Sequence, residues 1–147
     1  MARTQNLSDA IGEPTTKVVA RTTLYSDIDL SFKAHPNTGD ITTLRDAEAI
    51  KQSVRNLIST NPGERPFSPT LGSRVRGLLF ELVDSFTAIS LREAIKEVLL
   101  NYEPRIRVQE VSVIPEEDNN RYRISISYQI ITSLSTGDVT FYLERIR

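Results

Sequence analysis

Glu103, Pro104 and Arg105 place a carboxylate and a guanidinium on either side of a proline. Proline has no amide hydrogen and disfavours helical geometry at the residue before it, so the helical pattern that reaches Tyr102 should end at Glu103. The two charged side chains are then held on a stiff turn. Such a pair can neutralise itself within the fold, or it can be presented outward as a charge-assisted docking site.

Carboxylates elsewhere in the chain raise the question of glycoside hydrolysis. That chemistry uses two carboxyl groups about 5 to 9.5 Å apart, one of them with a raised pKa. Four acidic residues are candidates for such a pair: Glu64, Glu81, Asp84 and Glu103. Their spacing selects no particular pair, so the residues alone leave a glycosidase open as an alternative.

Other familiar sites lack their residues. The single histidine, His35, lies beside Pro36 in a predicted turn, and the sequence has no cysteine or second histidine to complete a zinc site. It also has no phosphate-binding glycine loop, dinucleotide fingerprint or nucleophile elbow. We therefore predict no cofactor and no metal ligand.

The composition fits one domain that works within an assembly. The chain has 147 residues, 39% of them hydrophobic, which suffices for one ordinary core. Its net charge of −1 gives no overall attraction to nucleic acid or to an anionic membrane. The 14 arginines against 4 lysines favour protein interfaces, where guanidinium groups make bidentate contacts. No apolar run approaches the roughly 20 residues that span a bilayer, and no signal-peptide core is seen, so we expect a soluble protein made in the cytosol.

Hydrophobic periodicity organises the first two thirds of the chain. Residues 1–24 have no sustained period and are predicted to form an extended N-terminal arm. Residues 25–32 alternate between apolar and polar side chains, which predicts a short strand. Periods near 3.6 predict three helices, over residues 44–60, 73–83 and 87–102.

The start of the first helix and the loop after it carry further signals. Thr43 and Asp46 have the spacing of a capping box, with Asp in place of the preferred Glu or Gln. Residues 61–69 contain three prolines and a glycine, so they must form a loop. Because Arg65 and Phe67 are unusual in a purely solvated loop, we expect this segment to pack or to meet a partner.

After Arg105 the period changes from 3.6 to 2. Alternation through Val113, then over residues 121–130 and 139–143, predicts a three-stranded antiparallel meander. The helices and strands come in separate blocks, which is typical of an α+β domain. We predict three helices packed on a three- to four-stranded antiparallel sheet formed mainly by the C-terminal third, with residues 25–147 as a single domain.

Four segments in order carry a resemblance to a known family. They are the helix from Asp46 to Ile58, the loop from Pro62 to Pro66, the stretch from Leu71 to Glu81, and Tyr102-Glu-Pro-Arg-Ile106 followed by strands. Together they resemble the baseplate wedge and sheath-initiator family of contractile phage tails, the gene 25 product family, which also carries a lysozyme-like name. Relatives occur in type VI secretion baseplates and other contractile injection systems. The resemblance covers residues 25 to 147, and Tyr102 stands where many relatives have tryptophan.

The resemblance implies a structural protein that is not an enzyme and has no catalytic residue. It implies a place in the virion tail baseplate, assembled in the host cytoplasm at six copies per baseplate. The implied partners are other wedge proteins with their helical core bundle and the first ring of tail sheath subunits, with tail tube or hub proteins as further candidates, and neither nucleic acid nor membrane. A peptidoglycan-degrading, lysozyme-like glycosidase stays the alternative.

Two sets of site residues follow from the resemblance together with the residue patterns. The first is a partner-docking set, in which the proline-rich loop either supports the turn or pairs within the fold: Glu103, Pro104, Arg105, Glu64 and Arg65. The second belongs to the terminal strand, which has no proline and which sheath subunits would extend by strand addition: Val139, Phe141, Tyr142 and Leu143. Tyr142 faces away from Phe141, so we expect a partner to cover it. The open alternative is that residues 25–32 cover this strand edge.

Overall fold

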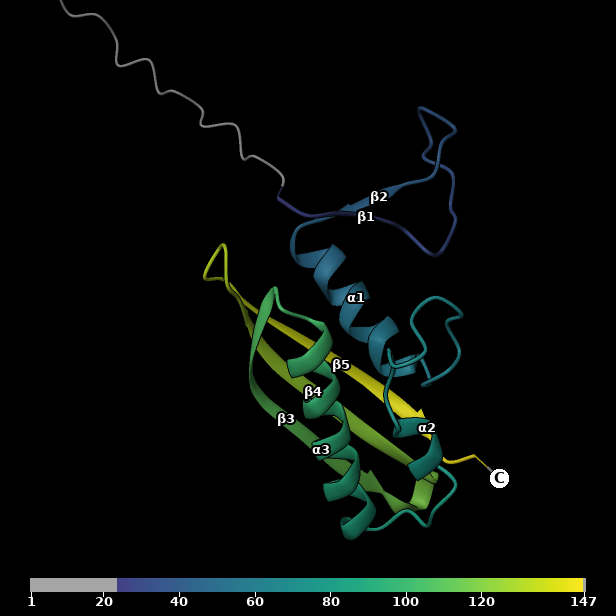
Figure 1. Cartoon of the computed structure of the whole chain (residues 1–147). Helices are drawn as coiled ribbons and strands as arrows, with labels where there is room; N and C mark the ends of the chain where they lie inside the picture. Colours follow the sequence, from purple (N-terminus) through teal and green to yellow (C-terminus); the bar gives the residue numbers. More distant parts are fainter. Residues whose placement is uncertain (1–23, 147) are drawn as a thin grey trace, which may run out of the picture.

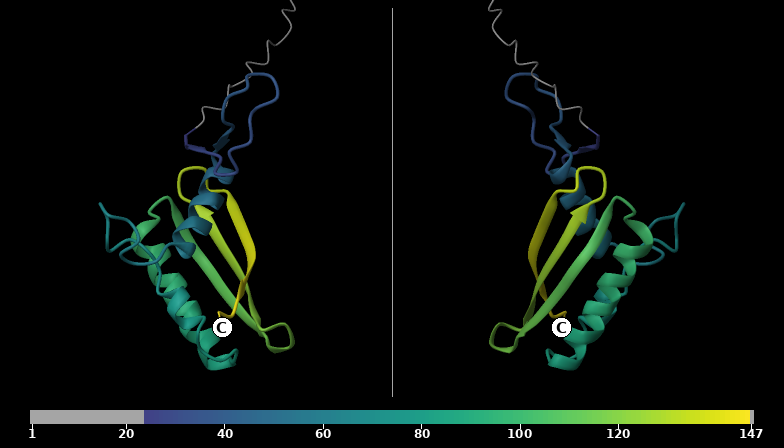
Figure 2. Two further views of the ribbon diagram at one scale, coloured as in Figure 1. Left: turned by 90° about the vertical axis from the view of Figure 1, so that its right-hand side faces the viewer. Right: turned by 90° about the vertical axis from the view of Figure 1, so that its left-hand side faces the viewer.

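The computed structural model describes residues 24–146, so the arm predicted for residues 1–24 lies outside the described residues except for Leu24. The elements in chain order are β1 (Ser26–Ile28), β2 (Thr43–Arg45), α1 (Ala47–Ser59), α2 (Val75–Leu78), α3 (Ser85–Tyr102), β3 (Ile106–Glu116), the short 3-10 helix η1 (Glu117–Asn119), β4 (Arg121–Ile130) and β5 (Thr136–Glu144). Helices α1 and α3 lie on the same side of the large sheet (Figures 1 and 2). The α+β prediction is confirmed.

The C-terminal strands form an antiparallel sheet in the order β3-β4-β5. Strand β4 is central, and its Ile126 pairs with Val111 of β3 and with Val139 of β5. The predicted alternation of β4 is confirmed, because its five apolar side chains are all buried: Tyr122, Ile124, Ile126, Tyr128 and Ile130. One face of the sheet therefore belongs to the core and the other stays polar.

Helices α1 and α3 supply most of the helical side of the core, with five buried apolar side chains each. The apolar stripe expected along α3 is confirmed from Ala88 to Leu99, but Tyr102, expected as its last member, is exposed. The side chain of Asp84 accepts a hydrogen bond from the backbone N–H of Thr87 and so caps the helix. None of the three described helices has the length and hydropathy of a membrane span.

Two predicted helix features are wrong. Helix α2 covers only four residues of the predicted range 73–83, because i to i+3 hydrogen bonds replace helical ones at Phe80 and Glu81, before Asp84 caps α3. Leu82 is consequently exposed instead of joining the core. The capping box is also absent, since Thr43 lies in β2 and the side chain of Asp46 accepts from the backbone of Leu24 and Tyr25.

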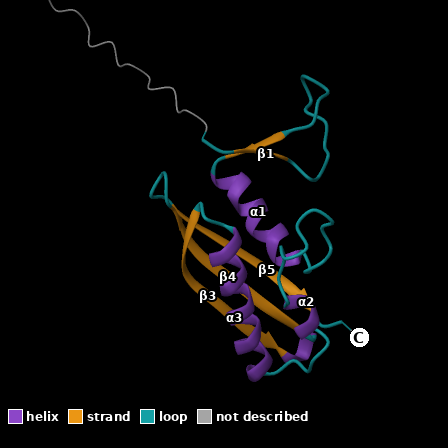
Figure 3. Cartoon of the chain, viewed as in Figure 1, coloured by secondary structure: helices purple, strands orange, loops and turns teal. Residues whose placement is uncertain are grey.

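The strand predicted at residues 25–32 is shorter than expected. It ends at Ile28 because the side chain of Asp29 accepts from both the backbone N–H and the hydroxyl of Ser31, which turns the chain. Strand β1 pairs with β2 in a separate two-stranded sheet. Figure 3 shows this pair beyond the end of α1, with a long loop between its strands. The alternative that residues 25–32 pair with the terminal strand is therefore wrong.

Candidate partner-docking and strand-addition sites

Helix α3 ends at Tyr102, as the proline at position 104 predicts. Glu103 has φ −123° and ψ 76°, which is outside helical geometry. Its backbone N–H still donates to the carbonyl of Leu99, and its own carbonyl accepts from Ile106 at the start of β3. The Glu-Pro-Arg turn thus joins the end of α3 directly to the first strand of the sheet.

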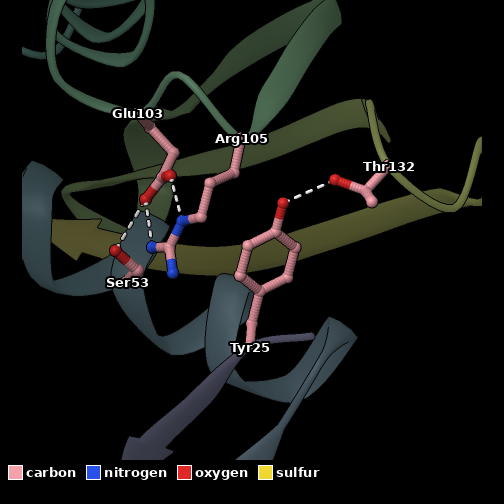
Figure 4. A network of polar contacts seen from close by, with 5 residues as sticks. All are labelled: Tyr25, Ser53, Glu103, Arg105 and Thr132. Carbon is pink, nitrogen blue, oxygen red and sulfur yellow. Dashed lines mark hydrogen bonds and ion pairs between the residues drawn. The ribbon is translucent and has the colours of Figure 1, made fainter. Parts of the chain in front are cut away.

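The carboxylate of Glu103 points into the fold, not outward (Figure 4). Only 3% of the residue is exposed. Its two oxygens accept from Arg105 Nε at 2.6 Å and Arg105 Nη2 at 2.7 Å, and Oε2 also accepts from the hydroxyl of Ser53 at 2.7 Å. The outward presentation that we expected is wrong for Glu103, because a buried carboxylate is stable only with such charge-assisted partners.

Two opposing effects act on the ionisation of Glu103. Burial raises its pKa, while the hydrogen bonds from Arg105 and Ser53 and the nearby guanidinium charge lower it, and the net result is a lowered pKa. The hydrogen bond to Glu103 raises the pKa of Arg105 against the opposing effect of burial. At neutral pH both groups are therefore charged, and they are hydrogen-bonded to each other.

Tyr25 covers the remaining side of Arg105. The guanidinium carbon lies 5.5 Å from the centre of the tyrosine ring, within range of a cation–π interaction. The Tyr25 hydroxyl is hydrogen-bonded to that of Thr132 after β4, at 2.5 Å (Figure 4). Asp46 holds this part of the chain in place, since its carboxylate accepts from the N–H of Leu24 and of Tyr25. We name Tyr25, Ser53, Glu103, Arg105 and Thr132 the Glu103 corner.

A partner can reach only the outer part of this corner. The side chain of Arg105 is 28% exposed, whereas that of Glu103 is 3% exposed. Sequence reasoning found Glu103 and Arg105 but missed Tyr25, Ser53 and Thr132, which come from distant segments and have no local pattern. Tyr25 was found only as a member of an alternating run.

The proline-rich loop is built mainly from its own contacts. Glu64 accepts from the backbone N–H of Asn61 at 2.8 Å, and the hydroxyl of Tyr102 donates to the carbonyl of Thr70. Gly72 has φ +140°, and a Cβ there would lie 2.6 Å from the carbonyl carbon of Asn61. The two ends of the loop are therefore held close together.

Arg65 and Phe67 are the exposed side chains of this loop. Phe67 is completely exposed. Arg65 lines a hollow that Ser53 and Tyr102 also line. Ser53 of α1 is bonded to Glu103, so the loop residue Arg65 lies across this hollow from one member of the Glu103 corner. Among the described ion pairs, neither Glu64 nor Arg65 takes part, so the alternative of a pair between them is not seen.

The terminal strand divides its four predicted residues between two faces. Val139 is fully buried, and Phe141 and Leu143 pack against the core. Tyr142 lies on the outer face and is 49% exposed. The guanidinium of Arg121 lies 4.3 Å from the centre of its ring, so this side chain already has a neighbour within the chain.

The backbone of β5 has a second alternation. At the two ends of the β4–β5 ladder, Ile130 donates to the carbonyl of Ser135 and Arg145 donates to that of Asn120. Bonded and non-bonded pairs alternate in an antiparallel ladder, so the register makes residues 137, 139, 141 and 143 the ones bonded to β4. The backbone groups of Thr136, Asp138, Thr140, Tyr142 and Glu144 therefore point away from the sheet.

The other edge of the sheet is protected in two ways. Strand β3 contains Pro115, which has no N–H, and a register shift between Val108 and Glu110. Strand β5 has neither a proline nor a shift in its register. Within residues 24–146, no strand pairs with the outer side of β5. Such an edge can accept a further strand.

Residues for a metal site are lacking in the described range. No cluster of three or more His, Asp or Glu side chains in residues 24–146 has a geometry that suits a metal ion. The four acidic residues whose pKa is shifted, Asp29, Asp84, Glu103 and Glu116, are all shifted downward, Asp29 and Asp84 chiefly by backbone hydrogen bonds and Glu116 chiefly by Arg121.

Comparison with known proteins gives one consistent family. The family model for the baseplate wedge protein gp25 matches residues 44–134. The baseplate wedge protein gp25 of Enterobacteria phage T4 is 36% identical over 108 residues, which are 74% of this chain and 81% of the T4 protein.

Two solved structures have a similar fold. A Geobacter sulfurreducens protein that carries the name tail lysozyme has a TM-score of 0.66 and 26% identity, over 72% of this chain and 97% of its own. A chain in the baseplate of the anti-feeding prophage has a TM-score of 0.64 and 26% identity, over 72% of this chain and 85% of its own.

Proposed function

This chain belongs to the baseplate wedge protein gp25 family of contractile tail systems, and from that membership we propose that it is a structural baseplate component whose strand β5 primes the tail sheath. A sheath subunit would add a strand to β5, and later sheath rings would repeat the same kind of contact. The proposed location is the virion tail baseplate, with assembly in the host cytoplasm at six copies per baseplate. Other wedge proteins and the first sheath ring are the proposed partners, with tube or hub proteins as further ones.

The open backbone of β5 is the observation that carries this proposal. Every second residue from Thr136 to Glu144 faces outward, and these five supply a repeating row of N–H donors and C=O acceptors. Main-chain hydrogen bonds would give the affinity of strand addition, and alternating side chains would fix its register. The opposite edge of the sheet supports this choice, because Pro115 and the β3 register shift make it a poor template.

Docking on the wedge would use the outer part of the Glu103 corner. Glu103 acts there as an internal brace that fixes the guanidinium of Arg105, and Arg105 and Tyr25 offer the surface that a partner can reach. Arg65 of the proline-rich loop, which lines the same hollow as Ser53, extends this surface. A rigid guanidinium loses little conformational entropy on binding, which favours its use in an interface.

A muralytic activity finds less support. A glycosidase needs a carboxylic acid whose pKa is raised, so that it is protonated when the leaving group departs. Glu103 has a lowered pKa and three hydrogen-bond donors on its oxygens. The relative from phage T4 has the name of a baseplate wedge protein. Release of reducing sugar from peptidoglycan by the purified chain, lost in Glu103→Gln, would favour the enzyme instead.

A proline at position 142 tests sheath priming. Tyr142→Pro removes an outward N–H while the pairs of Phe141 and Leu143 with β4 stay intact. Baseplates that contain this variant should assemble but carry no extended sheath in electron micrographs. Tyr142→Thr keeps the N–H and should prime sheath almost normally. Normal sheath on the folded proline variant would contradict the proposal.

A further inference from the structure

The first described residue, Leu24, lies near the turn that leads into β5. Leu24 and Ser135, which comes just before β5, line the same hollow. The backbone N–H of Leu24 points to the carboxylate of Asp46, which belongs to the turn before α1. Leu24, the first described residue, therefore lies near the residue that comes just before β5.

Residues 15–23 have a composition that suits a strand. They read Thr-Thr-Lys-Val-Val-Ala-Arg-Thr-Thr, of which six are β-branched and none is glycine or proline. A segment that lies along β5 and reaches Leu24 beside Ser135 must run opposite to β5. We propose that residues 15–23 of the same chain add to β5 as an antiparallel fourth strand, so that the free protein covers its own priming edge.

The proposed register places Leu24 opposite Ser135, because both residues line one hollow. With these two residues opposite each other, Arg21 faces Asp138 on the outer side of the sheet. Lys17 then faces Tyr142, diagonally next to Glu144. Opposite charges across neighbouring strands favour this alignment.

The inner side of the proposed strand fits the core in the same register. Ala20 lies opposite Val139, which is fully buried, and Val18 lies opposite Phe141, which packs against the core. A shift by one residue would instead place Lys17 and Arg21 over the apolar side of β5. The alternation of side chains and the charges on the outer side thus select the same register.

The far end of the proposed strand also agrees with the structure. Beyond Glu144, the N–H of Ile146 donates to the carbonyl of Leu79, so the chain itself completes the edge from that point on. Pro14 would lie opposite Arg145, where its missing N–H points away from β5. Gly12 and Pro14 then end the strand where the open edge ends.

The pairing of residues 15–23 with β5 is argued from the geometry of β5 alone. Its effect on sheath priming rests on the proposed function. A sheath strand that adds to β5 must first displace residues 15–23. The edge would then be unavailable to other copies of the chain before a sheath subunit arrives, which prevents edge-to-edge aggregation.

A designed disulfide tests the pairing and its register in the isolated full-length chain. The sequence has no cysteine, so two introduced thiols can react only with each other. Directly opposed residues of a bonded pair have Cα atoms about 5.5 Å apart, which a disulfide can bridge. We expect Arg21→Cys with Asp138→Cys to form an intramolecular disulfide on mild oxidation. Arg21→Cys with Tyr142→Cys, about 13 Å out of register, should form little.

Three results of this experiment would overturn the proposal. They are equal cross-linking of both pairs, no cross-linking of either, and cross-linked dimers as the main product, since dimers would mean that the segment is exchanged between copies. Sheath assembly is not needed for the measurement. A failed disulfide therefore leaves sheath priming untouched, and failed priming leaves the disulfide result untouched.

Amide hydrogen exchange provides a second test with matched proline variants. In the proposed register the N–H of Val19 points to β5 and that of Val18 points away. Val19→Pro should speed exchange of the Thr140 and Tyr142 amides by at least about tenfold, because the hydrogen bonds around position 19 are lost together. Val18→Pro should change them much less, and the amides of Val139 and Phe141 should stay protected in both. The proposal would be overturned if the Thr140 amide exchanged as fast in the unmodified chain as it does in Val19→Pro.

Discussion

The Glu103 corner and the outer edge of β5 are both polar, but they differ in where their hydrogen bonds are completed. At the corner, side chains from four distant segments satisfy one another, and both oxygens of Glu103 are bonded within the chain. At the edge, the five outward-facing residues have no backbone partner within residues 24–146. The first arrangement stabilises a shape, and the second requires a further strand.

This difference shows that a charged motif that stands out in a sequence can serve the fold itself and need not be the main binding surface. Glu103 and Arg105 stand out in the sequence, yet most of their hydrogen bonds are made with each other and with Ser53 inside the fold. Strand β5 has no unusual side chain, and its capacity to bind comes from the direction of its backbone groups. A binding edge of this kind needs an alternating pattern and an unprotected position in the sheet, not a catalytic type of residue.

The largest expected effect comes from breaking the buried pair. Arg105→Ala leaves the carboxylate of Glu103 buried with only Ser53 as a partner, and removal of one member of a buried pair typically costs about 3 to 5 kcal/mol. We expect a fall of that order in the free energy of unfolding, measured by urea denaturation. Loss of baseplate incorporation in this variant therefore does not by itself identify a docking residue.

The double variant Glu103→Gln with Arg105→Ala is the matched control. It removes the buried charge along with its partner, so it should be more stable than Arg105→Ala alone. If both variants lose the same stability, the carboxylate is not buried as an ion and the distinction between corner and edge is weakened.

Proline substitutions at neighbouring positions of β5 give the next largest effect. Phe141→Pro removes an N–H that is bonded to Ile124 and leaves a carbonyl inside the sheet unsatisfied, which typically costs about 1 to 3 kcal/mol beyond the lost packing. Tyr142→Pro removes only an outward N–H and should cost clearly less. Urea midpoints of the two variants compare them directly, and equal losses would show that the alternation of β5 is misassigned.

The sheet and the long helices could be predicted from the sequence because each has its own period. Alternation in residues 121–130 and the stripe from Ala88 to Leu99 correspond to buried faces in the structure. The end of α3 was also predictable, because Pro104 constrains the residue before it. These features depend on interactions between residues that are close in the sequence.

The remaining features depend on contacts between distant segments. Asp46 was expected to cap α1, but its carboxylate binds the backbone of Leu24 and Tyr25 more than 20 positions away. The inward direction of Glu103 likewise depends on Ser53, 50 positions earlier. No local pattern reports such pairs. The openness of the β5 edge could be predicted only as one of two alternatives, since it depends on whether residues 25–32 pair elsewhere.

The pH dependence of stability tests the ionised state of the corner. The pKa of Glu103 is lowered in the folded protein, so its contribution to stability is present above the unfolded pKa of about 4.3 and is lost as the pH falls through the folded pKa. The difference in the free energy of unfolding between the unmodified chain and Glu103→Gln should therefore be largest near pH 7 and shrink below pH 4. A difference that grows on acidification would contradict this sign. The backbone hydrogen bonds of β5 should add no such pH dependence to the free energy of unfolding, because backbone groups do not titrate.

The smallest expected effect concerns the ring that covers Arg105. Tyr25→Phe keeps the ring over the guanidinium and loses only the hydrogen bond to Thr132, which is worth about 0.5 to 1.5 kcal/mol and closer to the lower value at this exposed position. Tyr25→Leu also loses the cation–π interaction, a further 0.5 to 1 kcal/mol or so. Thermal or urea unfolding should place the two variants in that order, both well above Arg105→Ala. If Tyr25→Phe were as damaging as Arg105→Ala, the hydroxyl and not the buried ion pair would hold the corner together.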